Sequence, residues 1–250
     1  MNRLEGRICL ITGASSGLGA HFARIVSAQG ARVVLGARRM ERIAALADEL
    51  GAAAMAVELD VTDESSTIAA FDAAEAHFGP VDTVIANAGV SKPGRSTEVP
   101  VEALRSIFDT NLLGVYLTAR EAAKRMIAHG SRESGRGRIV MIGSMGAVAM
   151  IPGEVAYCAS KAAVATMGRN MASEWARMGI NVNVLQPGFI QTELAGDWFQ
   201  GEGGRTQIAA FPRKRLQPID SLNETVTYLC SDASLHMTGS VLILDDGQSL

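Results

Sequence analysis

The chain lacks the residue patterns that mark several classes of protein. Its three cysteines, Cys9, Cys158 and Cys230, lie far apart and follow no spacing of a disulfide framework or a zinc site. Its four histidines are scattered, and no His-Glu-x-x-His motif occurs. We therefore expect no bound metal and a reducing compartment.

Long runs of one kind of residue are also missing. No apolar run approaches the length of a membrane span. The residues from Met1 to Arg7 lead straight into an expected strand, which leaves no room for a signal peptide. The net charge is −3, and the densest basic cluster, 213–215, is too short for a nucleic-acid surface. We expect a cytoplasmic protein that binds neither nucleic acid nor membrane.

Short apolar runs alternate with helical patterns along the whole chain. Its 250 residues, 48% of them hydrophobic, suit one large globular domain. The expected strands are 7–11, 32–35, 54–59, 82–86, 138–142, 181–185 and 241–244. The expected helices are 17–28, 40–50, 64–77, 101–129, 154–177 and 221–230. This alternation predicts an α/β domain over 1–250, with a parallel sheet covered by helices on both faces.

A glycine-rich turn, 12–19, follows the first expected strand and opens a helix. Gly13, Gly17 and Gly19 permit a tight turn and let a pyrophosphate approach the backbone at the positive helix end. Because the spacing is Gly-x-x-x-Gly-x-Gly, a plain strand-to-helix turn is the competing interpretation.

Two arginines follow the second expected strand, where dinucleotide folds that prefer NAD usually place an acidic residue. Arg38 and Arg39 stand there instead, and guanidinium groups suit a 2′-phosphate. Ser15 is a further possible donor. The sequence therefore favours NADP(H) over NAD(H). The alternative is that both arginines are only solvated at a helix start, although the helix dipole disfavours cations there.

Tyr157 and Lys161 lie four residues apart on the expected helix 154–177 and so share one face. An adjacent ammonium favours the phenolate and lowers the tyrosine pKa from its usual value of about 10. Ser144, thirteen residues before the tyrosine, follows a strand at the edge where open α/β sheets bind ligands. It could equally cap a turn, and no Gly-x-Ser-x-Gly elbow accompanies it.

The motifs occur along the chain in the order Thr12–Gly19, Ala86-Asn87-Ala88-Gly89, Asn111, Ser144, Tyr157-x-x-x-Lys161 and Pro187-Gly188. In this order and approximate spacing they resemble the short-chain dehydrogenase/reductase family over nearly the whole chain, although Ala86 stands where a further Asn is common. The resemblance implies a Rossmann-type doubly wound α/β fold with about seven strands in the order 3-2-1-4-5-6-7. It also suggests a homotetramer or homodimer built through the long helices 101–129 and 154–177.

The resemblance implies four catalytic residues. Tyr157 would exchange a proton with the substrate oxygen, which Ser144 would hydrogen-bond. Lys161 would lower the tyrosine pKa and bind the nicotinamide ribose. Asn111 would hold a helix distortion and a water that links to the lysine. The implied cofactor-binding residues are Gly13, Ser15, Ser16, Gly17, Leu18, Gly19, Arg38, Arg39, Asp60, Val61, Asn87, Ala88, Gly89, Tyr157, Lys161, Pro187, Gly188, Ile190 and Thr192.

Substrate contacts are expected just before Tyr157 and in an irregular segment, 189–218, that would form a mobile lid. The candidates are Ser144, Met145, Met150, Glu154, Phe189 and Trp198. The apolar candidates Met145, Met150, Phe189 and Trp198 favour a bulky ketone or 3-oxoacyl thioester, unless they only pack the lid against the body. The predicted function is NADP(H)-dependent interconversion of a ketone and a secondary alcohol. The competing hypothesis is a catalytically silent dinucleotide-binding regulatory or scaffold protein.

Overall fold

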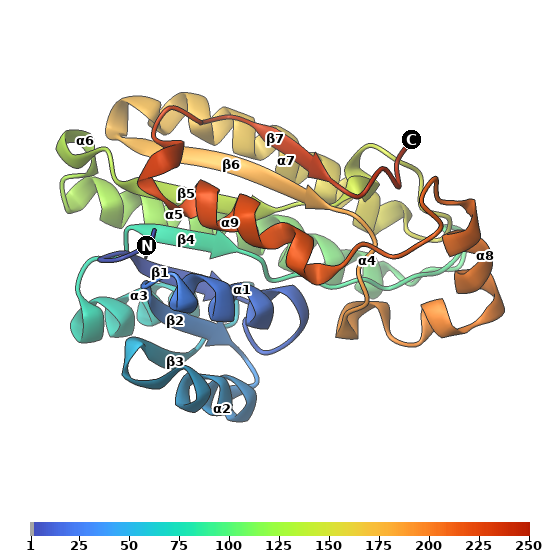
Figure 1. The fold of residues 1–250 in the computed structure, drawn as a ribbon, viewed down its shortest axis with the longest axis horizontal. Helices are drawn as coiled ribbons and strands as arrows, with labels where there is room; N and C mark the ends of the chain where they lie inside the picture. Colours follow the sequence, from blue (N-terminus) through green and yellow to red (C-terminus); the bar gives the residue numbers. More distant parts are fainter. Residues whose placement is uncertain (1–2) are drawn as a thin grey trace.

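The computed structural model describes residues 3–250, and within them seven strands form one parallel sheet (Figure 1). The strands are β1 (Ile8–Thr12), β2 (Arg32–Ala37), β3 (Ala54–Glu58), β4 (Thr83–Ala86), β5 (Gly137–Ile142), β6 (Ile180–Pro187) and β7 (Val241–Leu244). Their order is β3-β2-β1-β4-β5-β6-β7, and every neighbouring pair is parallel. The predicted fold class and strand order are confirmed.

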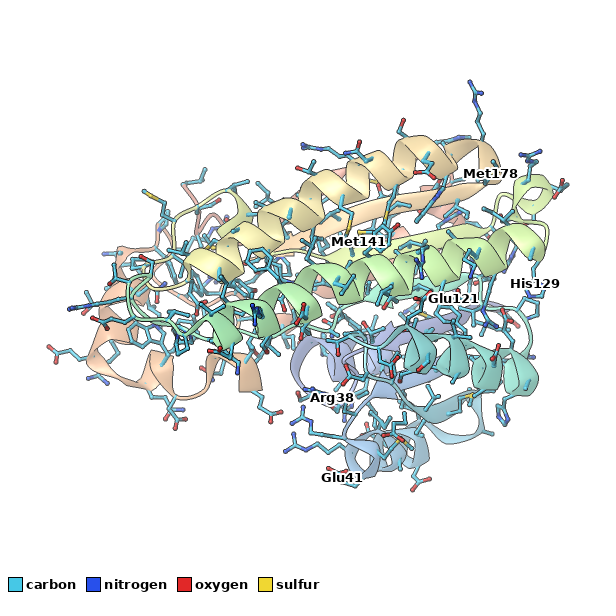
Figure 2. All side chains as sticks on the ribbon, turned by 180° about the vertical axis from the view of Figure 1, so that it is seen from behind. Arg38, Glu41, Glu121, His129, Met141 and Met178 are labelled. Atoms are coloured by element: carbon cyan, nitrogen blue, oxygen red, sulfur yellow. The ribbon has the colours of Figure 1, made fainter. Side chains whose placement is uncertain are left out.

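Helices cover both faces of the sheet, as the uninterrupted apolar strands predicted. One face carries α1 (Gly17–Ala28), α2 (Met40–Leu50) and α9 (Asn223–Cys230). The other carries α3 (Glu64–Phe78), α5 (Gly114–Ala128) and α7 (Val155–Trp175), and Figure 2 shows α5 and α7 side by side there. Successive side chains of β2 alternate between the faces, since Val34 packs on the α3 side and Val33 and Leu35 on the α1 side.

The long helix expected over 101–129 is divided in its middle. It consists of α4 (Val101–Phe108), a π-helical stretch over Asp109–Leu113 and α5, with no break in the helical path. Asn111 lies in the π-helical stretch and is fully buried. The structure thus contains the helix distortion that the resemblance implied at this residue. Between α5 and β5, where no helix or strand was expected, the chain forms the short helix α6 (Ser131–Ser134).

The segment 189–218 is more regular than predicted. It contains the 3₁₀ turns η5 (Glu193–Ala195) and η6 (Trp198–Gln200) and the helix α8 (Glu202–Ala210), which lies beyond the end of the sheet in Figure 1. Gly203 and Gly204 hid the helical pattern, since glycine weakens a helix. At Gly204 a side chain would place its Cβ 2.2 Å from the carbonyl oxygen of Trp198. Close packing of α8 on η6 therefore requires glycine there.

Membrane-spanning helices and clusters of metal-binding side chains were not expected from the sequence. Across residues 3–250, no helix is both long and apolar enough to span a bilayer. In the same range no group of three or more His, Cys, Asp or Glu side chains is arranged to hold a metal ion.

Candidate active site

A cleft of about 390 Å³ lies at the carboxyl ends of the central strands, where open α/β sheets bind ligands. Most of the predicted cofactor-binding residues line it. They are Gly13, Ser15, Ser16, Gly17, Leu18, Arg38, Arg39, Asp60, Val61, Asn87, Ala88, Gly89, Tyr157, Lys161 and Thr192. Residues that follow β1, β2, β3 and β4 thus meet those of α7 and of the segment after β6 around one space.

Four of the predicted cofactor-binding residues lie outside this lining: Gly19, Pro187, Gly188 and Ile190. A Cβ on Gly19 would lie 2.3 Å from the carbonyl oxygen of Gly13, so this glycine lets α1 pack on the turn. A Cβ on Gly188 would lie 2.4 Å from Oε1 of Gln248, and Ile190 is buried in the core. Gly19, Gly188 and Ile190 therefore contribute to packing and do not line the cleft.

Several residues that line the cleft belong to no motif that predicted a site. They are Ala37, Leu59, Val90, Thr110, Ile142, Gly143 and Leu194. Most of them directly follow or precede a predicted site residue. Their apolar or small side chains, however, carry no chemical pattern of their own. Thr110 is the neighbour of Asn111 on the π-helical stretch, and only the distorted helix brings it to the cleft.

Backbone geometry at the glycine-rich turn fits a dinucleotide. Gly13 and Gly17 have φ values of +68° and +52°, in the left-handed region that favours glycine. Thr12 Oγ1 accepts hydrogen bonds from the backbone N–H groups of Asn87 (3.0 Å) and Ala88 (3.1 Å), which fastens the end of β4 to the end of β1. The turn therefore presents bare backbone beside a helix N-terminus, an arrangement that suits a pyrophosphate.

Lys161 stands at the opposite end of the cleft from this turn and is held by the main chain. It is 3% exposed, and its Nζ donates a hydrogen bond of 2.8 Å to the carbonyl oxygen of Ile142. A Cβ on Gly89 would lie 3.6 Å from this Nζ and 3.5 Å from Oδ1 of Asn111. Glycine at 89 thus keeps open the space in front of both polar groups, which fits the predicted place of the nicotinamide ribose.

The electrostatics of Tyr157 and Lys161 differ from the sequence-based expectation. The ammonium lies 5.8 Å from the centre of the tyrosine ring. Burial lowers the pKa of Lys161 to about 8, because it disfavours the charged form. Burial also raises the pKa of Tyr157 to about 12; the Ser144 hydroxyl opposes this rise, and the carboxylate of Glu154 adds to it. Among these residues, desolvation outweighs the predicted lowering by Lys161.

Asn111 bonds three segments together. Its Oδ1 accepts a hydrogen bond of 2.8 Å from the backbone N–H of Val90, and its Nδ2 donates one of 2.9 Å to the Val90 carbonyl oxygen. Nδ2 also lies 3.2 Å from the hydroxyl oxygen of Ser160 on α7. The amide needs both its donor and its acceptor for this pattern, which fixes the loop after β4 against α7 next to Lys161.

Ser144 combines the two interpretations that the sequence left open. Its Oγ accepts a hydrogen bond of 3.0 Å from the N–H of Gly146 and so caps the 3₁₀ turn η3 (Met145–Ala147). The same hydroxyl lies close enough to Tyr157 to favour its phenolate. A turn cap that also faces the tyrosine has a fixed position, which suits a group that orients a substrate oxygen.

The predicted substrate-binding residues fall into two groups. Met145 is buried beside Ser144, and Glu154 is half-buried at the start of α7, with a hydrogen bond of 2.5 Å from Ser91 Oγ to its Oε1. Its Oε2 is buried without a hydrogen-bond partner in the described part of the chain, and burial raises the pKa of this carboxyl group. These two residues lie next to Ser144 and Tyr157.

The other three candidates lie farther out. Met150 is 98% exposed. Trp198 is mostly exposed, and its Nε1–H donates a hydrogen bond of 2.8 Å to Gln207 of α8. Phe189 packs against Phe199 and Phe211, with ring centres 5.8 and 5.5 Å apart. The three phenylalanines of the segment after β6 thus pack on one another.

Arg38 and Arg39, at the start of α2, have different surroundings. Arg38, labelled in Figure 2, is largely exposed and lies 3.9 Å from a carboxylate oxygen of Asp60. Arg39 instead donates hydrogen bonds to Ser15 Oγ (3.0 and 2.9 Å) and Ser16 Oγ (2.8 Å). The structure therefore brings Arg39 and Ser15 together, as a shared 2′-phosphate site requires.

Comparisons with known proteins agree with this geometry. The family model for short chain dehydrogenase matches residues 7–203. The D-threitol dehydrogenase of Mycolicibacterium smegmatis is 34% identical over 251 residues, covering 99% of this chain and 95% of that protein.

Solved structures are similar over the same length. A 3-ketoacyl-(acyl-carrier-protein) reductase from Brucella melitensis, complexed with NADH, is 34% identical with a TM-score of 0.90 and covers 99% of this chain and 100% of that one. A gluconate 5-dehydrogenase from Burkholderia cenocepacia, in complex with NADP and tartrate, is 32% identical with a TM-score of 0.92 and covers 99% and 96%. The chain belongs to the short-chain dehydrogenase/reductase family, as its motifs predicted.

Proposed function

We propose that this protein is an NADP(H)-dependent oxidoreductase that interconverts a ketone and a secondary alcohol. The observation that carries the proposal is the content of one cleft. A glycine-rich turn and Arg39 form one end of it, and Tyr157 and Lys161 form the other. A dinucleotide laid along the cleft would extend from a phosphate site to a proton-transfer pair.

The residues of this chain divide the proton chemistry among them. The Tyr157 hydroxyl gives its proton to the substrate oxygen in reduction, and its phenolate takes the alcohol proton in oxidation. Ser144 donates to the same oxygen and fixes its position. Lys161 binds the ribose hydroxyls and stabilises the phenolate. Asn111 holds a water that continues the proton relay from Lys161. Hydride transfer is the chemistry that a bound nicotinamide would supply.

The cofactor preference depends on the residues at the end of β2. Arg38 and Arg39 offer guanidinium groups with no acidic residue beside them in sequence. The hydroxyl oxygen of Ser15 accepts a hydrogen bond from Arg39. Charge-assisted hydrogen bonds of this kind suit a phosphate. The Brucella relative holds NADH and the Burkholderia relative NADP, so the cofactor is inferred from these side chains and not from similarity.

The substrate is a small carbonyl or alcohol compound, and we favour a hydrophobic one such as a bulky ketone or 3-oxoacyl thioester because the apolar side chain of Met145 directly follows Ser144. The segment 189–218 would form the lid.

A homotetramer or homodimer is supported by the exposed apolar side chains of Tyr116 and Ile127 on α5, which border a groove shared with α7. We expect a cytoplasmic location.

The test is turnover of a panel of ketones, 3-oxoacyl thioesters and hydroxysteroids with NADPH and NADH. Tyr157→Phe should lower kcat/KM for the active substrate by roughly 10²–10⁴-fold. Tyr228→Phe, a matched change in α9 on the opposite face of the sheet, should retain activity. Equal activity of wild type and Tyr157→Phe would remove the tyrosine from the mechanism. NADPH binding without turnover on the whole panel would support the catalytically silent dinucleotide-binding alternative.

A further inference from the structure

Glu193 connects the segment after β6 to the start of α2. It directly follows Thr192 and begins η5. Its Oε1 accepts hydrogen bonds from Arg39 Nη1 (2.8 Å) and Arg42 Nη1 (3.0 Å), and its Oε2 accepts one from Arg42 (2.8 Å). The residues involved are more than 150 positions apart in sequence.

The carboxylate of Glu193 is half-exposed and ionised. Hydrogen bonds from Arg39 and Ser16 hold the pKa of Glu193 at about 2, so the group is ionised throughout the neutral range. Its side chain is 48% exposed, and those of Arg39 and Arg42 are similarly exposed. Ion pairs in such surroundings contribute little to stability, so this contact can exchange partners at small cost.

The three nitrogens of the Arg39 guanidinium group donate hydrogen bonds to three different side chains. It donates to the hydroxyl oxygens of Ser15 and Ser16 through Nε and Nη2, and to Glu193 through Nη1. Guanidinium groups bind carboxylate and phosphate in the same way. A 2′-phosphate at Ser15 and Arg39 would therefore stand next to a fixed negative charge and would have to share this guanidinium group with it.

We propose that Glu193 determines cofactor specificity, by competing with the 2′-phosphate of NADP(H) for Arg39. The inference rests on the proposed function, in which Arg39 binds that phosphate. When Arg39 is released, both carboxylate oxygens of Glu193 still accept hydrogen bonds from Arg42. NADP(H) can therefore displace Glu193 from Arg39 without leaving the carboxylate unpaired. NAD(H) has no phosphate at this place and leaves the contact intact. The preference for NADP(H) is then smaller in the wild type than Arg38 and Arg39 alone would give.

The experiment is titration of the protein with NADPH and with NADH, followed by nicotinamide fluorescence without substrate. Glu193→Gln removes the charge and keeps the size of the side chain. It should tighten NADPH binding by about three- to fivefold, the upper scale of an exposed charge pair, and change NADH binding by less than about twofold. Glu202→Gln, at the start of α8 in the same segment, is the matched control and should change neither.

Two results with Glu193→Gln alone would overturn the inference. One is an equal change in both dissociation constants, since the 2′-phosphate would then not be the competitor. The other is weaker NADPH binding by Glu193→Gln. The effect should also disappear when Arg39→Gln is combined with Glu193→Gln, because the contested donor is gone; a persisting effect would contradict the competition.

The same titrations separate this inference from the proposed cofactor choice. If Arg39→Gln alone leaves the NADPH dissociation constant unchanged, the assignment of Arg39 to the 2′-phosphate fails, and the competition fails with it. If Arg39→Gln weakens NADPH binding while Glu193→Gln leaves the ratio of the two dissociation constants unchanged, only the competition fails.

Discussion

At the end of the cleft that contains Tyr157, buried polar side chains are bonded to the main chain. Lys161 donates to the carbonyl oxygen of Ile142, and Asn111 pairs with both polar groups of Val90. At the end that contains Arg39, half-exposed side chains are bonded to one another, with Ser15 and Glu193 as partners. The contacts of Lys161 and Asn111 are thus made with the main chain of β5 and of the loop after β4. The contacts of Arg39 are made with other side chains.

This difference indicates how each end can change. A partner in the main chain cannot be exchanged without moving β5 or the loop after β4, so the proton-transfer geometry tolerates little substitution. A partner in a side chain can be replaced by another anion or donor at the surface, where each ion pair contributes little. We infer that the cleft is rigid where protons move and adjustable where the cofactor phosphate is recognised.

The largest effect on stability should come from Asn111→Asp. The carboxylate would face the carbonyl oxygen of Val90 with no donor to give it, and the resulting buried unpaired charge should cost about 3 kcal/mol. Tm should fall by roughly 6–12 °C for a chain of this size. Thermal unfolding followed by circular dichroism measures this.

Exposure and pH provide the controls for that substitution. Asn170→Asp, on the exposed surface of α7, should shift the free energy of unfolding by less than about 0.5 kcal/mol. Burial raises the pKa of the new Asp carboxyl, and its protonated form can again donate to Val90. The loss of stability should therefore shrink as pH falls. Equal Tm values for the two variants would show that the buried end is not more rigidly held.

A smaller and more selective effect is expected at the phosphate end from Arg38→Asp. The new carboxylate would repel a 2′-phosphate and could accept a hydrogen bond from a ribose hydroxyl. The ratio of kcat/KM for NADPH to that for NADH should fall by at least about tenfold, while Tm changes little because Arg38 is exposed. Steady-state kinetics with both cofactors measures the ratio.

Arg169→Asp on the exposed face of α7 repeats the same charge change away from the cleft. It should leave the cofactor ratio unchanged. A ratio that is the same in wild type and Arg38→Asp would mean that the basic side chains after β2 do not select the cofactor.

The sequence predicted the two ends of the cleft unequally well. Strand ends and the four-residue spacing of Tyr157 and Lys161 follow local rules of the chain, so the parallel sheet and the glycine-rich turn were predictable. Nothing local distinguishes Arg38 from Arg39, yet only Arg39 contacts Ser15. Glu193 gave no signal because its partners lie more than 150 residues away and depend on the path of the segment after β6.

Helix α8 and the tyrosine pKa were missed for other physical reasons. Gly203 and Gly204 weaken the helical pattern of α8, and only contact with η6 explains them. The pKa of Tyr157 depends on how much water the fold removes from the phenol, a quantity that residue spacing does not contain. Spacing showed that a cation was near, whereas the structure shows that burial has the larger effect.

The smallest predicted effect tests that balance at the buried end. The Glu154 carboxylate raises the pKa of Tyr157, so Glu154→Gln should lower it. Alcohol oxidation needs the phenolate, and its kcat/KM rises as pH passes the tyrosine pKa; this limb should move to lower pH by a few tenths of a unit. Glu174→Gln, at the far end of α7, should not move it. A shift toward higher pH would mean that the hydrogen bond from Ser91 to Glu154, and not the charge of the carboxylate, controls the tyrosine.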